Sequence, residues 1–122
     1  MIVDDDADLQ FIYEIIFNRV ENIEIMGQAY DGEEAVEMFI QMNPKPNVII
    51  MDQRMPRMDG ITATKLIKEL DDRARIIFVS GDESVKDEAL AVGADHFFVK
   101  SIHAEELVES IVRAQNSGHQ FN

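Results

Sequence analysis

Cysteine does not occur in this chain of 122 residues. Without thiols the protein can form neither disulfides nor thiolate metal sites, and a cytoplasmic protein needs neither. Basic side chains are scarce, because 11 Lys and Arg residues stand against 24 Asp and Glu residues. The formal charge of −13 argues against nucleic acid as the ligand of this domain. No apolar run approaches the roughly 20 residues of a membrane span, and no basic segment precedes an apolar stretch near the start. We therefore expect an untargeted cytoplasmic protein that does not enter a membrane.

Short runs rich in β-branched residues alternate with longer segments of helical period, which is typical of repeated βαβ units around a parallel sheet. Predicted strands cover residues 1–3, 23–29, 47–51, 76–79 and 96–99. Predicted helices cover residues 7–20, 33–42, 60–70, 84–92 and 104–114. Strand 47–51 is apolar on both faces, which places it in the centre of the sheet. The length and the apolar fraction of 46% suit one α/β domain that folds alone.

The predicted helices present apolar faces at helical spacing, and we expect these faces to pack on the sheet. In helix 7–20 the face consists of Leu9, Ile12, Ile16 and Val20. In helix 33–42 it consists of Ala35, Met38, Phe39 and Met42. In helix 104–114 it consists of Leu107, Val108 and Ile111.

Acidic residues follow two of the apolar runs. Asp4 and Asp5 come after residues 1–3, and Asp52 comes after residues 47–51. If both runs are neighbouring parallel strands, their carboxyl ends open on the same crevice, where α/β sheets place ligands. Carboxylates this close repel one another, and a divalent cation with oxygen ligands removes that cost, so we expect a Mg²⁺-dependent phosphate site. The alternative is that Asp4 to Asp6 cap a helix and Asp52 begins a turn.

Two further polar residues follow strands in the same way. Ser80 comes after residues 76–79 and Lys100 after residues 96–99, so both should reach the acidic crevice. Taken alone, Ser80 could be a helix or turn cap. Lys100 could equally be a lysine that extends its amine from a strand end into solvent.

Five short motifs carry this chemistry, one after another along the chain. They are Val3-Asp4-Asp5, Met51-Asp52, Met55-Pro56-x-Met58-Asp59-Gly60, Val79-Ser80-Gly81 and Phe98-Val99-Lys100. In this combination the chain resembles the receiver domain of two-component response regulators, of the chemotaxis type, over essentially its whole length. The resemblance implies a flavodoxin-like, doubly wound (βα)5 fold with a parallel five-stranded sheet of order 2-1-3-4-5. We expect the receiver domain to span residues 1–115, and residues 116–122 to be a frayed C-terminal end or the stub of a linker.

The resemblance also implies roles for the residues of the crevice. Asp52 would be the phosphoacceptor, taking a phosphoryl group from a phosphohistidine of a sensor histidine kinase or a phosphotransfer protein. Asp5 would hold Mg²⁺ directly and Asp4 chiefly through water, and Asp52 and the backbone carbonyl of Arg54 would complete the protein ligands. Lys100 and Ser80 would contact phosphoryl oxygens.

Several positions depart from the pattern of that family. Ser101 stands where proline is usual, and we expect a cis Lys100–Ser101 bond, tolerated at a functional site despite its cost of about 3 to 4 kcal/mol. Phe97 matches the switch aromatic but lacks the hydroxyl of tyrosine. Arg54 and Asp82 form an opposite-charge pair across the mouth of the site, which either tunes the lifetime of the phosphoryl group or is only a surface ion pair.

The sequence is compatible with three functions. The first is a phosphorylation-controlled switch, catalysing only its own phosphotransfer and dephosphorylation, whose partners read the surface of the fourth helix, fifth strand and fifth helix. The second is a magnesium phosphohydrolase of the haloacid dehalogenase type, although residues 4–8 lack the final Thr or Val of that motif. The third is a degenerate receiver that binds partners without phosphorylation. The output partner and the pathway stay open, and we expect a monomer or a weak homodimer.

Overall fold

Five parallel strands form the centre of the computed structural model, which describes the backbone of residues 1–100 and 103–120 and the side chains up to residue 114. The strands are β1 (Ile2–Val3), β2 (Gln28–Ala29), β3 (Val48–Asp52), β4 (Arg75–Ser80) and β5 (His96–Val99). Their order in the sheet is β2-β1-β3-β4-β5, and every pairing is parallel. The predicted flavodoxin-like topology is confirmed, with β3 in the centre.

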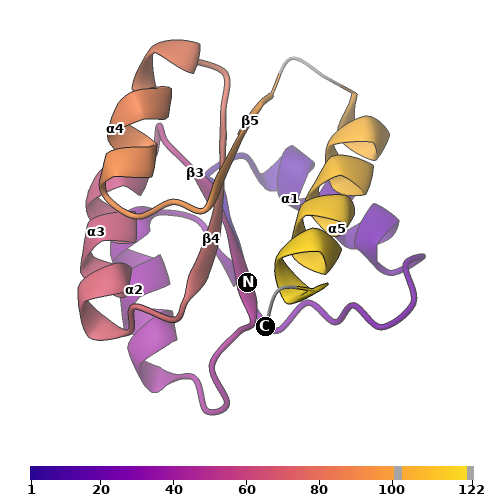
Figure 1. The fold of residues 1–122 in the computed structure, drawn as a ribbon, viewed down its shortest axis with the longest axis horizontal. Coiled ribbons are helices and arrows are strands. Elements are labelled where there is room, and N and C mark those ends of the chain that lie inside the picture. The colour runs from indigo at the N-terminus through magenta and orange to yellow at the C-terminus, as the bar shows by residue number, and fades with distance from the viewer. Residues whose placement is uncertain (101–102, 121–122) are drawn as a thin grey trace.

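Helices cover both faces of this sheet, as Figure 1 shows. The helices α1 (Ala7–Phe17) and α5 (Ala104–Gln120) lie on one face. The opposite face carries α2 (Gly32–Gln41), α3 (Gly60–Leu70) and the short α4 (Lys86–Ala91), which follows a 3-10 turn over Glu83–Val85. Along residues 1–100 and 103–120, no helix combines the length and apolar character needed to cross a membrane.

The apolar core is divided by the sheet into two layers. Under α2, α3 and α4, Ala35 and Phe39 are buried as predicted, and Met38 and Met42 pack against them. Under α1 and α5, the predicted residues Leu107, Val108 and Ile111 are all buried.

The inward face of α1 differs from the prediction. Gln10, Tyr13 and Phe17 are the buried residues, whereas Ile12 is 41% exposed. Leu9 and Ile16 lie at the margin of the core. The cause is that α1 carries apolar side chains around most of its circumference, so that their spacing does not define a single face.

Three element boundaries differ from the prediction by three residues or more, and several others by one or two residues. Only the last two residues of the predicted strand 23–29 pair, because β1 offers just Ile2 and Val3 as partners. The first helix ends at Phe17 instead of residue 20. The last helix continues to Gln120 instead of ending at residue 114.

Candidate functional site

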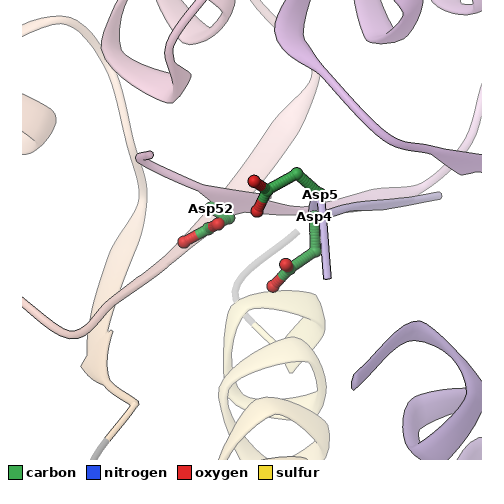
Figure 2. A group of neighbouring side chains, drawn as sticks. All are labelled: Asp4, Asp5 and Asp52. Carbon is green, nitrogen blue, oxygen red and sulfur yellow. The ribbon is translucent and has the colours of Figure 1, made fainter. Parts of the chain in front are cut away.

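Three carboxylates meet at the carboxyl end of the sheet. Asp4 and Asp5 follow β1, and Asp52 is the last residue of the neighbouring strand β3. One oxygen from each carboxylate can be chosen so that all three lie within 4.8 Å of one another (Figure 2). Asp4 and Asp52 are 2% and 6% exposed, and Asp5 is exposed. An all-oxygen, acidic donor set of this kind fits a hard divalent cation such as Mg²⁺.

The backbone around these carboxylates is fixed by a buried side chain that the sequence reasoning missed. The side-chain amide of Gln10 donates to the carbonyls of Ile2, Asp4 and Ala29, at 3.2, 3.1 and 2.8 Å. The amide of Gln28 donates in turn to the Gln10 side-chain oxygen at 3.0 Å. The Gln10 side chain therefore links the backbone of β1 to that of β2. No local signal distinguishes it from an exposed glutamine in an amphipathic helix.

The alternative in which Asp4 to Asp6 cap a helix and Asp52 begins a turn holds only for Asp6, which lies next to this group. Asp6 is the N-cap of α1, since its carboxylate accepts the amides of Asp8 and Leu9. Asp52, by contrast, ends a strand, and the cap of the following helix α3 is Asp59. The side chain of Asp52 is therefore available to the crevice.

Lys100 lies in the same crevice, as predicted. Its Nζ is 2.8 Å from Oδ2 of Asp4 and 3.1 Å from Oδ1 of Asp52. The alternative of a lysine that extends into solvent is therefore wrong. The predicted cis Lys100–Ser101 bond lies outside the described residues.

The charges of the crevice shift two pKa values. Burial, together with the negative charge of Asp4, raises the pKa of Asp52 to about 6, although Lys100 acts in the opposite direction. For Lys100, burial lowers the pKa, but the carboxylates of Asp4 and Asp52 more than offset this and leave the pKa raised. The crevice therefore brings one ammonium group together with three carboxyl groups, and this excess of acidic groups favours a cation.

Ser80 ends β4 and is buried at the edge of the crevice. Its Oγ accepts the backbone N–H of Asp82 at 3.1 Å, so the hydroxyl can still donate its hydrogen to an oxygen placed beside Asp52. On the adjacent strand, Phe97 is half-buried and stacks on Phe78 with ring centroids 6.0 Å apart. Both residues therefore lie where the sequence placed them.

The predicted pair at the mouth of the site is present. Nη2 of Arg54 lies 3.8 Å from Oδ2 of Asp82, with side chains 86% and 37% exposed. Asp82 also begins the 3-10 turn, and the hydrogen bonds from the hydroxyl and backbone of Ser84 lower its pKa, with a smaller effect from Arg54. The crevice between these groups has a volume of about 450 Å³. Its lining residues are Asp5, Asp6, Asp52, Arg54, Ser80, Gly81, Asp82 and Lys100.

Residues 1–112 match the family described as the response regulator receiver domain, and the chain belongs to this family. The chemotaxis protein CheY of Bacillus subtilis is 37% identical over 118 residues, which cover 95% of this chain and 96% of that protein. CheY of Thermotoga maritima is 36% identical over 113 residues, which cover 91% and 92%. The chain is therefore a CheY-like receiver domain of a two-component system.

Solved structures agree with this assignment. CheY from Borrelia burgdorferi, in its complex with CheX, BeF3 and magnesium, has a TM-score of 0.82 and 34% identity, covering 92% of this chain and 84% of that one. The response regulator domain of Thermotoga maritima CheB has a TM-score of 0.81 and 36% identity, covering 94% and 93%. CheY-like receiver domains act as signalling switches and not as true enzymes, so the haloacid dehalogenase alternative is set aside.

Proposed function

We propose that Asp52 is the phosphoacceptor of this receiver domain and that phosphorylation depends on Mg²⁺. The observation that carries the proposal is the meeting of Asp4, Asp5 and Asp52, whose oxygens lie within 4.8 Å, with the amine of Lys100 3.1 Å from Asp52. Phosphoryl transfer needs little beyond positioning and neutralisation of charge, and this group of residues supplies both.

In the proposed reaction a carboxylate oxygen of Asp52 forms a bond to phosphorus while the bond from phosphorus to the donor's imidazole nitrogen breaks. The product is an aspartyl phosphate and a free histidine on the donor. Lys100 would pair with one phosphoryl oxygen, and the Ser80 hydroxyl would donate to another. When bound, Mg²⁺ supplies neutralisation of the charge on the transferring group. Asp5, Asp52 and the Arg54 carbonyl would hold it directly, and Asp4 chiefly through water.

The same arrangement supports a switch. A phosphoryl group on Asp52 would draw Ser80 inward, and Phe97 would follow into the vacated space. Ser80 and Phe97 lie on the paired strands β4 and β5, where Phe78 is opposite Phe97 and Ser80 is opposite Val99. The shift would change the surface formed by α4, β5 and α5, where output partners would bind, as a change of population between two packings.

The partners follow from the same chemistry. A sensor histidine kinase or a phosphotransfer protein would supply the phosphoryl group, and an output partner or effector domain would read the switch. The Borrelia relative forms a complex with CheX in the presence of BeF3 and magnesium. That complex supports a partner that binds the activated form of this chain.

A labelling experiment separates this function from that of a degenerate receiver. With acetyl phosphate or phosphoramidate and millimolar Mg²⁺, we expect one acid-labile phosphate per chain. The protein should consume the donor only by phosphorylating and dephosphorylating that one site. A degenerate receiver would give no label. A phosphohydrolase would release phosphate from many external substrates.

A further inference from the structure

The loop between β3 and α3 carries Arg54, and its end near Asp52 is held by its own side chains. The side-chain oxygen of Gln53 accepts the amide of Ile61 at 2.9 Å, and its amide donates to Asp59 at 3.3 Å. Gly60 packs so closely that a Cβ there would come within 2.0 Å of the Asp52 carbonyl oxygen. Both ends of the loop, at Gln53 and at Asp59 and Gly60, are therefore fixed next to the end of β3.

The middle of the loop, at Arg57 and Met58, is fixed to another helix. Nε and Nη2 of Arg57 both donate to Oδ2 of Asp31, at 3.0 and 2.5 Å. Nearby, the Gly32 amide donates to the Met58 carbonyl at 3.0 Å. A Cβ on Gly32 would approach that carbonyl oxygen to 2.4 Å, so the loop backbone lies directly on the start of α2.

Arg57 has an unusual backbone for its residue type. Its φ is +65°, in the left-handed region that L residues other than glycine adopt at a cost. Its side chain is 66% exposed, while the Asp31 carboxylate that it contacts is 3% exposed. A mostly exposed arginine thus bends over a buried carboxylate, and the contact compensates a conformation that the backbone disfavours.

Asp31 performs two separable tasks. Its Oδ1 accepts the Glu34 amide at 2.8 Å and so caps α2, while its Oδ2 accepts from Arg57. Asparagine caps helices about as well as aspartate but carries no charge for the arginine. The substitution Asp31→Asn therefore removes the ionic contact with the loop and leaves the cap.

From these contacts we infer that the Asp31–Arg57 pair is a positioning device that holds the β3–α3 loop so that the Arg54 carbonyl stays directed at the metal site. The inference rests on the proposed function, which makes that carbonyl a ligand. Arg57 is three residues from Arg54, and the two anchors of the loop lie on either side of Arg54. Loss of the pair would leave the carboxylates in place and free only the backbone ligand.

The test is the Mg²⁺ dissociation constant, measured by titration calorimetry on chelator-treated protein, together with urea unfolding of each variant. We expect Asp31→Asn and Arg57→Gly each to weaken Mg²⁺ binding by about tenfold, as loss of groups that orient metal ligands commonly does. The double variant should bind no more weakly than either single variant, because both changes remove one contact. Arg57→Gly relieves the left-handed backbone and should keep the urea midpoint close to that of the wild type.

The matched control is Lys68→Gln, which removes the contact between Nζ of Lys68 and Asp95 at 3.1 Å. Lys68 lies in the last turn of α3, at the opposite end of the sheet, so Mg²⁺ affinity should stay at the wild-type value. Unchanged affinity in Asp31→Asn and Arg57→Gly, beside normal binding by the wild type, would overturn the inference alone. Failure of the wild type itself to bind Mg²⁺ would overturn the proposed function and the inference with it.

Discussion

Asp52 is the residue at which burial and charge conflict most directly. Its pKa is raised to about 6 by burial and by Asp4, so folding with an ionised Asp52 costs free energy at neutral pH. Asp52→Asn should therefore raise the free energy of unfolding by about 3 kcal/mol at pH 7.5 in a chelator, because the pKa rises from 3.8 to about 6 and each unit of pKa corresponds to about 1.4 kcal/mol.

The pH dependence of that gain has a definite sign. A carboxyl whose folded pKa lies above its unfolded value destabilises the fold increasingly as the pH rises from about 4 to 6, and by a constant amount above that. The advantage of Asp52→Asn over the wild type should therefore vanish as the pH is lowered towards 4. Urea unfolding at several pH values measures it. A variant less stable than the wild type at pH 7.5 would contradict the electrostatic account of the site.

Tyr13 is a second residue whose environment can be tested alone. It is fully buried beneath the acidic crevice, and its hydroxyl has no hydrogen-bond partner among the residues that the structure describes. Burial, reinforced by the charges of Asp4 and Asp52, raises the pKa of this phenol. The hydroxyl thus bears a desolvation cost that phenylalanine would not.

Tyr13→Phe should accordingly leave stability unchanged or raise it by about 1 kcal/mol. Tyr13→Ala should lower it by about 3 to 5 kcal/mol, because it leaves a cavity. Phe11→Ala on the exposed side of the same helix serves as the control and should have little effect. A loss above about 1 kcal/mol in Tyr13→Phe would indicate a hydrogen bond from this hydroxyl.

At the scale of elements, two loops meet at the mouth of the site through Arg54 and Asp82. If the pair shields the phosphoryl group from in-line attack by water, Arg54→Ala should change the rate of aspartyl-phosphate loss but not Mg²⁺ affinity, since the proposed ligand is a backbone carbonyl. The effect of Asp82→Ala should then depend on whether Arg54 is present.

A double-mutant cycle on the dephosphorylation rate tests this coupling. If both single variants and the double variant have rates within about twofold of the wild type, Arg54 and Asp82 are only a surface ion pair and do not set the lifetime of the phosphoryl group. Such a result would be unremarkable for side chains as exposed as these.

The elements also show what the sequence could predict. The ends of the β-branched runs located Asp4, Asp52, Ser80 and Lys100, because parallel strands bring their carboxyl ends to one edge whatever the details of packing. The face of α1 was mispredicted, since apolar residues surround that helix and tertiary packing selects Tyr13 over Ile12. The extent of β2 could not be predicted either, because it depends on the length of its partner strand.

Contacts between distant parts of the whole molecule were beyond sequence reasoning. Gln10 reaches carbonyls on two strands, and Arg57 reaches Asp31, 26 residues earlier in the chain. No local sequence motif marks either residue, and the fold alone brings each side chain to its partner. Both contacts support the site but lie outside it, and a prediction that uses only the residues at strand ends cannot find them.

The whole molecule should be stabilised by the metal. Three carboxylates at one edge destabilise the fold by mutual repulsion, and an ion that binds only the folded chain raises stability by mass action. Millimolar Mg²⁺ should therefore raise the melting temperature of the wild type and have a smaller effect on Asp5→Ala. Scanning calorimetry with and without the ion measures both melting temperatures. Equal shifts in both proteins would mean that Asp5 is not a ligand.

The most direct test of the account is to map the phosphorylated residue by mass spectrometry after treatment with acetyl phosphate and Mg²⁺. We predict one phosphoryl group per chain, on the peptide that contains Asp52, formed only when Mg²⁺ is present and absent from Asp52→Asn. A stoichiometric phosphoryl group on any other residue, or an acid-stable adduct that persists in Asp52→Asn, would contradict the account.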